Sequence, residues 1–314
     1  MLIVLGILLP VFGLVAIGYG MARTPLLKTE GVRGLGSFVY YVALPALLFR
    51  STATPPPGES GGGAIVAAFF GGAVILFVLG MLLARFRFGM NLSEQGVVGV
   101  NASFGNSVQM GVPLVLAAFG PQGMHAMALV IALQSVILLT LATIVIELGG
   151  WRGGAAMGRS IRAVLKALVT NPIIMAIVAG ILWREAGLAL PTPLLRLIDL
   201  LGDGASPCAL FALGASLAGF RLTAGLGDTA LVVGLKLVVQ PLTVWLLARL
   251  LGLAPLDLAV VTLAAALPIG MNAFIMAQRY QLYVAQSASA VVLSNLLSVP
   301  TLGAVLGFFA GPPP

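Results

Sequence analysis

The sequence predicts an all-α membrane protein, and two observations carry that prediction. Apolar residues make up 60% of the chain and charged residues only 8%, with a mean hydropathy of +1.12, whereas a soluble domain is about half apolar and about a quarter charged. The apolar residues also form runs of about 20, the length of a helix that crosses the hydrocarbon core. Helices are expected because the alternation of barrel strands is absent and open strands leave backbone groups unpaired in lipid.

The first half of the chain contains five predicted spans. Charges and turn signals delimit them as 1–22, 31–53, 62–84, 95–119 and 123–147. The first is interpreted as a retained span, because no basic segment precedes it as in a secretory signal. Residues 95–146 carry no charge and are too long for one span, so the turn-like FGPQG at 119–123 is expected to divide them.

The second half contains five more predicted spans, at 164–184, 194–220, 229–249, 257–278 and 281–309. Between the halves lies a polar segment, so the chain divides into a first repeat at 1–148, a connecting loop at 149–163 and a second repeat at 164–314. An odd number of spans inverts the second half, which predicts two inverted five-helix repeats. LPALLF at 44–49 resembles SPCALF at 206–211, in the second span of each half.

The distribution of positive charge predicts the orientation. Most lysines and arginines lie in loops after odd-numbered spans, and the other loops hold only Arg50, Arg184, Arg196 and Arg249. Loops rich in positive charge stay on the cytoplasmic side. The connecting loop is therefore expected in the cytoplasm, and both termini outside a plasma or inner membrane that the chain crosses many times.

The fourth and ninth spans carry signals of a broken helix. The fourth reads VNASFGNSVQMGVPLV at 100–115, and the ninth reads TLAAALPIGMNAFIMAQ at 262–278. Proline removes a helix donor and glycine lowers the cost of unwound backbone. Interrupted spans at matching positions of two halves indicate a transporter binding site. The predicted break residues are Gly105, Gly111, Pro113 and Pro268.

This pattern resembles the auxin efflux carrier family, which includes the plant PIN proteins and belongs to the wider group of the bile acid sodium symporters. The residues that carry the resemblance are NASFGNSVQMGVP at 101–113, PCALFALGASLA at 207–218 and LPIGMNAFIMA at 267–277. It implies that the fourth and ninth helices cross at mid-membrane and form the substrate site. It also implies scaffold and transport subdomains interleaved across both repeats, elevator-like alternating access, and small organic acids such as malate or malonate as substrates.

The polar residues of the broken spans are the candidate substrate ligands. A primary amide donates to a carboxylate, and its oxygen can accept from a ligand or coordinate Na⁺; the alternative is that it caps its own broken helix. Gln134 and Asn295, in the fifth and tenth spans, either line the same cavity or join helices, as do Ser135 and Ser294. The predicted set is Asn101, Asn106, Ser107, Gln109, Gly270, Asn272, Gln134 and Asn295.

Two charged residues are candidates for charge coupling. Lys236 lies inside the eighth span, where a charge costs several kcal/mol unless it is paired or snorkels. It is expected to pair with Asp199 or Asp203, to attract an anionic substrate, or to snorkel to the interface. Asp203 could also take up a proton or simply lie at the outer interface.

The predicted function is secondary transport of a small organic anion. The alternatives are a Na⁺-coupled organic acid symporter and, less favoured, a channel or a receptor that does not transport. An enzyme is not expected, since paired intramembrane acids and the zinc-protease and Ser–His motifs are absent, and a primary pump is not expected without an ATP-binding motif. One Cys with one His excludes a thiolate or His-rich metal site. The expected partners are the substrate anion, lipid and a second copy of the chain. Nucleic acid is not expected as a partner despite a net charge of +7. H⁺ or Na⁺ is a conceivable coupling ion, and no other cofactor is expected.

Overall fold

The computed structural model describes residues 2–54, 61–150, 158, 162, 166, 169–220 and 226–310. Their regular structure consists of helices, with one isolated antiparallel bridge between Gly105 and Ile269. The predicted connecting loop 149–163 lies largely outside the described residues. The all-α class predicted from composition is confirmed.

The helices of the first half follow the predicted spans closely. α2 continues through a π-helical segment, Val39–Ala43, into α3, and α7 continues through another, Ser135–Leu139, into α8. A short 3₁₀ helix, Pro121–Gly123, separates α6 from α7, where the turn was expected. The helices are α1 (Leu2–Ala22), α2 (Thr29–Phe38), α3 (Leu44–Ala53), α4 (Gly62–Phe88), α5 (Leu92–Ser103), α6 (Val112–Phe119), α7 (Met124–Gln134) and α8 (Thr140–Gly150).

In the second half, Gly204 separates α11 from α12 within one predicted span. The π-helical segment Leu235–Val239 joins α13 to α14. The helices are α10 (Pro172–Glu185), α11 (Thr192–Asp203), α12 (Ala205–Leu217), α13 (Leu226–Gly234), α14 (Gln240–Leu250), α15 (Pro255–Ala265), α16 (Met271–Tyr280) and α17 (Val284–Ala310).

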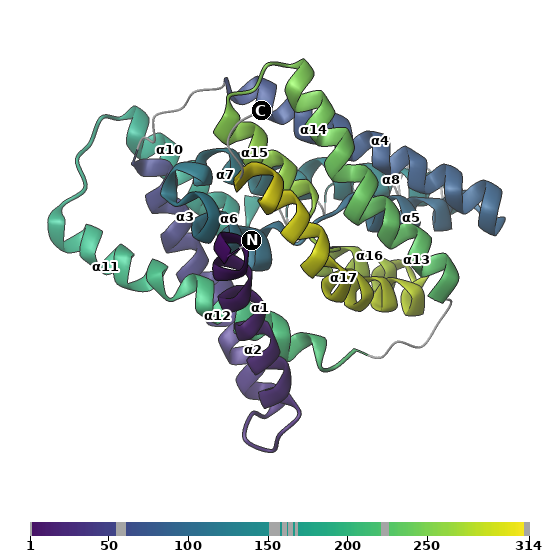
Figure 1. Ribbon diagram of the computed structural model, residues 1–314, viewed down its shortest axis with the longest axis horizontal. Coiled ribbons are helices and arrows are strands. Elements are labelled where there is room, and N and C mark those ends of the chain that lie inside the picture. Colours follow the sequence, from purple (N-terminus) through teal and green to yellow (C-terminus); the bar gives the residue numbers. More distant parts are fainter. Residues whose placement is uncertain are drawn as a thin grey trace.

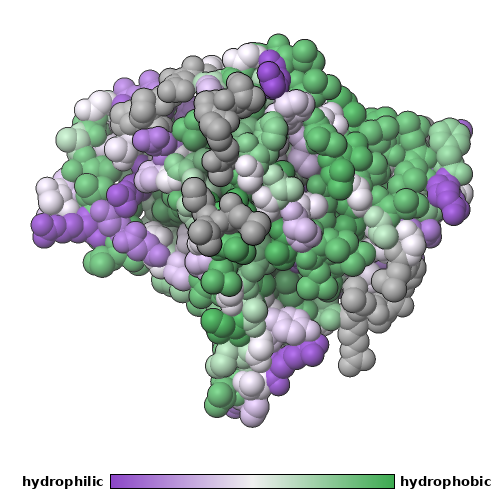
Figure 2. All heavy atoms as spheres, viewed as in Figure 1, coloured by the Kyte–Doolittle hydropathy of each residue, from purple (hydrophilic) through white to green (hydrophobic). Residues whose placement is uncertain are grey.

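Seven helical stretches of the described residues are long and apolar enough to cross a membrane. They are Val4–Ala22, Thr29–Ala53, Gly62–Phe88, Pro121–Gly150, Thr192–Leu217, Gly227–Leu250 and Val284–Phe309. Ser107–Phe119 and Pro255–Ala265 are shorter apolar helices. Apolar side chains cover much of the face in Figure 2, and the most hydrophilic ones gather near its margins. Large apolar residues such as Leu9, Phe86 and Leu200 are exposed, as expected of a surface that faces lipid.

Proline accompanies three of the π-helical segments. Pro45, Pro113 and Pro241 are each the second residue of the α-helix that follows such a segment. Proline has no N–H for an α-helical hydrogen bond and its ring clashes with the carbonyl four residues before. One wider turn before the proline accommodates this misfit. The chain therefore continues through these prolines without breaking.

The helices form two bundles, which lie side by side in Figure 1. The first bundle consists of α1, α2, α3, α10, α11 and α12, in which α1 packs along α12 and α3 packs against α10 and α11. The second bundle consists of α4 to α8 and α13 to α17, in which α4 packs against α5 and α14, and α13 packs against α17. They meet where α1 contacts α6 and α17 and where α3 contacts α7. Each bundle therefore takes helices from both halves of the sequence.

Glycine brings helix backbones together within each bundle. A Cβ on Gly18 would lie 2.1 Å from the Phe211 carbonyl oxygen, and one on Gly214 would lie 1.9 Å from that of Val15, so α1 and α12 touch backbone to backbone. Small residues allow such close packing between helices in a membrane. In the described residues, every contact of this kind shorter than 3.0 Å lies within one bundle. Within the described ranges, the contact between the bundles therefore has no such interlock.

Candidate functional site

Two broken helices meet in the second bundle. The chain leaves helical geometry at 104–106, after α5, and again at 266–270, between α15 and α16. The two extended segments pair in antiparallel fashion: Asn106 N–H donates to the Pro268 carbonyl at 2.8 Å, and Gly270 N–H donates to the Phe104 carbonyl at 3.0 Å. The fourth and ninth predicted spans thus touch at their interruptions.

The two prolines that were predicted to cause the breaks have different positions. Pro268 lies inside the second break, where its carbonyl accepts one bridging hydrogen bond. Pro113 lies instead in α6, beyond the π-helical segment Ser107–Gly111, while the first break is centred on Gly105. The prediction that Pro113 causes the first break needs this correction. The wider π-helical turn before Pro113 accommodates a residue that has no N–H to donate. Gly111 is buried in that turn, where a Cβ would lie 2.3 Å from Met127 Cε.

Side chains from neighbouring helices pair with the backbone groups that the breaks release. Gln134 Nε2 on α7 donates to the Gly105 carbonyl at 2.7 Å, and Gln240 Nε2 on α14 donates to the Ser103 carbonyl at 3.0 Å. At the second break, Ile269 N–H donates to Ser294 Oγ on α17 at 3.0 Å, and Lys236 Nζ donates to the Ala265 carbonyl at 2.6 Å. Unwound backbone at membrane depth requires such partners. These contacts fix the crossing in place.

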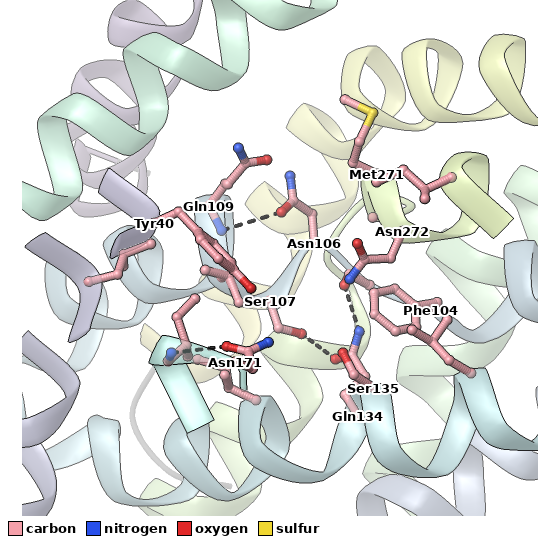
Figure 3. A pocket seen from close by; sticks show the side chains of 18 of the residues that line it. Tyr40, Phe104, Asn106, Ser107, Gln109, Gln134, Ser135, Asn171, Met271 and Asn272 are labelled. Atoms are coloured by element: carbon pink, nitrogen blue, oxygen red, sulfur yellow. Dashed lines mark hydrogen bonds between the residues drawn. The ribbon is translucent and has the colours of Figure 1, made fainter. Parts of the chain in front are cut away.

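A cavity of about 560 Å³ opens beside the crossing, between the two bundles. The second bundle contributes residues of both breaks, the segment that begins at Ser107, one face of α16, and part of α7 with the π-helical segment after it. The first bundle contributes α2 with the π-helical segment after it, α3 and the start of α10. Figure 3 shows the polar side chains around this space. The polar or charged lining residues are Tyr40, Asn106, Ser107, Gln109, Gln134, Ser135, Asn171, Asn272 and Arg279.

Asn106, in the first paired segment, and Asn272, in the first turn of α16 directly after the second, present amides to the cavity (Figure 3). Asn106 Oδ1 accepts from the Gln109 backbone N–H at 3.3 Å, so this side chain caps its own helix, as the alternative interpretation expected. Its Nδ2 has no hydrogen-bond partner among the described residues. Asn272 is exposed, and its side-chain amide has no partner in the same part of the chain. Both residues can therefore donate to a ligand.

Two further polar groups of the cavity are held in place by hydrogen bonds. Ser107 Oγ donates to Gln134 Oε1, and both side chains are buried (Figure 3). Gln109 and Ser135 line the wall, and Gly270 lies directly before α16. A Cβ on Gly270 would lie 2.8 Å from the Gly105 carbonyl oxygen, so only glycine lets the two breaks approach this closely.

Two predicted ligands lie away from the cavity. Asn101 Nδ2 donates to Ser287 Oγ and to the Val97 carbonyl, both at 2.9 Å. Asn295 Nδ2 donates to the Val291 carbonyl, on its own helix, at 2.8 Å. These side chains join or stiffen helices of the second bundle, which was the alternative interpretation of such residues.

The charged candidates also lie outside the cavity. Asp203 ends α11 and is exposed. Asp199 pairs with Arg50 at 2.8 Å, so the expected ion pair with Lys236 is wrong. Lys236 does not snorkel either, since its exposed fraction is 0%.

Sequence reasoning missed three of the polar or charged lining residues. Arg279 was counted only as a loop charge, although it follows Asn272 by seven residues and helical periodicity places both on one face of α16. Asn171 precedes Pro172 and caps α10, accepting from Ile173 N–H at 2.9 Å, which is a recognisable helix start. Tyr40 carried no signal that distinguishes it from other aromatic residues of the apolar runs.

The electrostatics of the cavity favour an anion. Arg279 is the charged member among the described lining residues, and its charge is positive. The N-termini of α16 and of the segment that begins at Ser107 both start at the crossing, and helix N-termini carry unpaired N–H groups and a partial positive charge. A small anion that entered would meet donors on several sides.

The chain is similar to known transport proteins over most of its length. A family model described as "Membrane transport protein" matches residues 3–305. The chain is 29% identical to a putative malonate transporter of Rhizobium meliloti over 304 residues, 96% of this chain and 94% of that protein. It is 24% identical to auxin efflux carrier component 8 of Arabidopsis thaliana, over 93% of each chain. An uncharacterised transporter of Methanothermobacter thermautotrophicus is 26% identical over 94% of each chain. The resemblance predicted from the three motifs is confirmed.

Proposed function

We propose, from the premise that this chain belongs to the membrane transport protein family, that it is a secondary carrier of a small organic anion. The observation that carries the proposal is the donor-rich cavity beside the crossing. Among the described lining residues of this cavity, Arg279 is the charged one. Its other polar groups are neutral amides and hydroxyls. A carboxylate suits this lining because it accepts several hydrogen bonds at once.

One carboxylate would bind at the crossing itself. Asn106 Nδ2 and the Asn272 amide are free to donate, and the N–H groups at the start of α16 lie beside them. Ser107 and Gln134 are already bonded to each other and act as a rigid support. The substrate would then exchange hydrogen bonds with water for hydrogen bonds with fixed donors.

Arg279 favours a substrate with a second carboxylate. It lies about two turns beyond Asn272 along α16, at the opposite end of the lined face. Seven residues span about 10 Å along a helix, more than the separation of the two carboxylates in a short dicarboxylate. The long Arg279 side chain would therefore extend along the face toward Asn272 to bind the second carboxylate, which a monocarboxylate does not offer. The relative from Rhizobium meliloti is named as a putative malonate transporter, so malonate is the first dicarboxylate to test.

Alternating access would occur by movement of one bundle against the other. The cavity lies between them, and the tight glycine contacts hold helices together within each bundle but not across the boundary. The second bundle would act as the moving part, because it contains the crossing. The first bundle would act as the scaffold.

An inverted repeat accounts for how the bundles take helices from both halves. The broken helices α5–α6 and α15–α16 would be the fourth and ninth of ten spans, and α7 and α17, which follow them, each supply a side chain to the adjacent break. With Arg279 on the cytoplasmic side, as its loop predicts, both termini would face outward from the cell membrane and the cavity would open to the cytoplasm.

The proposal is tested with purified protein in liposomes. Liposomes loaded with unlabelled malonate should accumulate external labelled malonate, with a rate that saturates and that rises with internal substrate. Malonate should also raise the melting temperature in detergent, since a ligand of the native state stabilises it by mass action. Unsaturable flux at channel rates, or no flux and no thermal shift with any mono- or dicarboxylate, would contradict it.

A further inference from the structure

Lys236 is a positive charge buried behind the crossing. It lies in the π-helical segment that joins α13 to α14, and its exposed fraction is 0%. A charged side chain at such a position is costly and marks a functional site by default. It does not line the cavity, so direct contact with the substrate does not explain it.

The ammonium group has a backbone oxygen as its partner. Nζ donates to the Ala265 carbonyl at 2.6 Å, at the point where α15 ends, and no carboxylate of the described residues lies within ion-pair distance of it. A Cβ placed on Gly105 would lie 3.4 Å both from Nζ and from the Ala264 carbonyl oxygen. The ammonium therefore lies directly behind the backbone that forms the cavity wall.

The groups around this position are those that bind a hard cation. Carbonyl and amide oxygens are the usual protein ligands of such ions. Besides Ala264 and Ala265, the buried Gln240 follows Lys236 by four residues, and its Oε1 has no hydrogen-bond partner within the described part of the chain. Its Nε2 donates to the Ser103 carbonyl at the first break. Oxygen atoms of this kind thus lie near both breaks, and the lysine side chain provides the cation.

We propose that Lys236 is a tethered cation that fills a cation position at the crossing. Its ammonium replaces a bound coupling ion: it satisfies the carbonyl oxygen at the end of α15 and places a positive charge behind the anion site. The inference rests on the proposed function. Its consequence is a carrier that needs no Na⁺, in contrast to the sodium-coupled alternative, because the position that Na⁺ would use is already occupied.

The test is chemical rescue. Lys236→Ala removes three methylene groups and the ammonium, which together correspond to propylammonium. Lys236→Met retains most of the volume without the charge, and Lys28→Ala removes an exposed lysine as the matched control. Melting temperature and malonate exchange are measured for each variant in choline chloride, with and without propylammonium, and wild-type exchange is also measured in NaCl.

We expect Lys236→Ala to melt at a lower temperature and to exchange about tenfold more slowly, since one buried carbonyl loses its donor. Propylammonium should restore both in the alanine variant but not in the methionine variant, whose side chain fills the space. The control should behave like the wild type with and without propylammonium. Wild-type exchange should be equal in NaCl and choline chloride. If propylammonium restores the melting temperature of the alanine variant but the wild type does not exchange malonate, the cation position is supported and the carrier proposal fails.

Three results would overturn the inference. The first is a Lys236→Ala variant that melts and exchanges like the wild type without added cation. The second is a defect in melting that propylammonium does not repair. The third is a wild-type carrier that exchanges malonate only in the presence of Na⁺.

Discussion

Gly270→Ala should disrupt the crossing through one methyl group. The added Cβ would lie 2.8 Å from the Gly105 carbonyl oxygen and 2.9 Å from Phe104 Cδ1, whereas a carbon and an oxygen in contact are about 3.3–3.6 Å apart. The segments must therefore separate by about 0.5–0.8 Å. The carbonyl cannot turn away freely, because Gln134 Nε2 is bonded to it at 2.7 Å.

That separation would stretch the hydrogen bonds that pair the breaks. The Gly270 N–H bond to the Phe104 carbonyl, now 3.0 Å, would exceed the usual hydrogen-bond range. Overpacking costs about 1–3 kcal/mol and a lost hydrogen bond about 1 kcal/mol more. Backbone strain does not contribute, since Gly270 has φ −76° and ψ 148°, which alanine adopts readily.

The assay is thermal unfolding in detergent together with malonate exchange, and Gly105→Ala is the matched control. A Cβ on Gly105 meets its nearest neighbours at 3.4 Å, an ordinary contact. We expect Gly270→Ala to melt several degrees lower and to lose exchange, and Gly105→Ala to stay close to the wild type. Equal behaviour of the two variants would refute the proposed geometry of the crossing.

Two further predictions concern single side chains around the cavity. Arg279→Gln should raise the KM for malonate about tenfold, which is the effect of losing one charge-assisted hydrogen bond. The KM for acetate should change much less. Exchange rates measured over a range of concentrations give both KM values, and an equal change in the two would argue against a second carboxylate site. Gln134→Leu should lower stability by about 1–3 kcal/mol, because the Gly105 carbonyl loses its donor. Gln109→Leu serves as its control in thermal melts, and similar melting of both would count against Gln134 as a support of the break.

Much of the site could be predicted because breaking a helix in lipid requires specific residues. Proline and glycine beside asparagine identified both interruptions, and Asn106 and Asn272 indeed line one cavity. The location of the first break was harder to predict. Pro113 is the stronger sequence signal, but a π-helical turn accommodates it and the chain unwinds at Gly105 instead.

The charged groups were harder to place than the helix breaks. Whether Lys236 snorkels or stays buried depends on what packs over it, which one span does not determine. Arg279 reads as a loop charge until α16 is known to start at the crossing and to turn its face toward the first bundle. Asn101 and Asn295 look like ligands by type, but their hydrogen-bond partners lie inside the second bundle. Tertiary contacts, which the local pattern does not encode, decide the positions of Lys236, Arg279 and Asn101, whereas Asn295 bonds within its own helix.

The central claim is that the amide of Asn272 holds a substrate carboxylate at the crossing. Counterflow of labelled malonate by Asn272→Ala tests it most directly, with Gln278→Ala as the control because Gln278 carries the same group on the same helix, is exposed, and does not line the cavity. Both variants should melt like the wild type. We predict that Asn272→Ala loses counterflow while Gln278→Ala retains it. Full counterflow by the Asn272 variant would contradict the account.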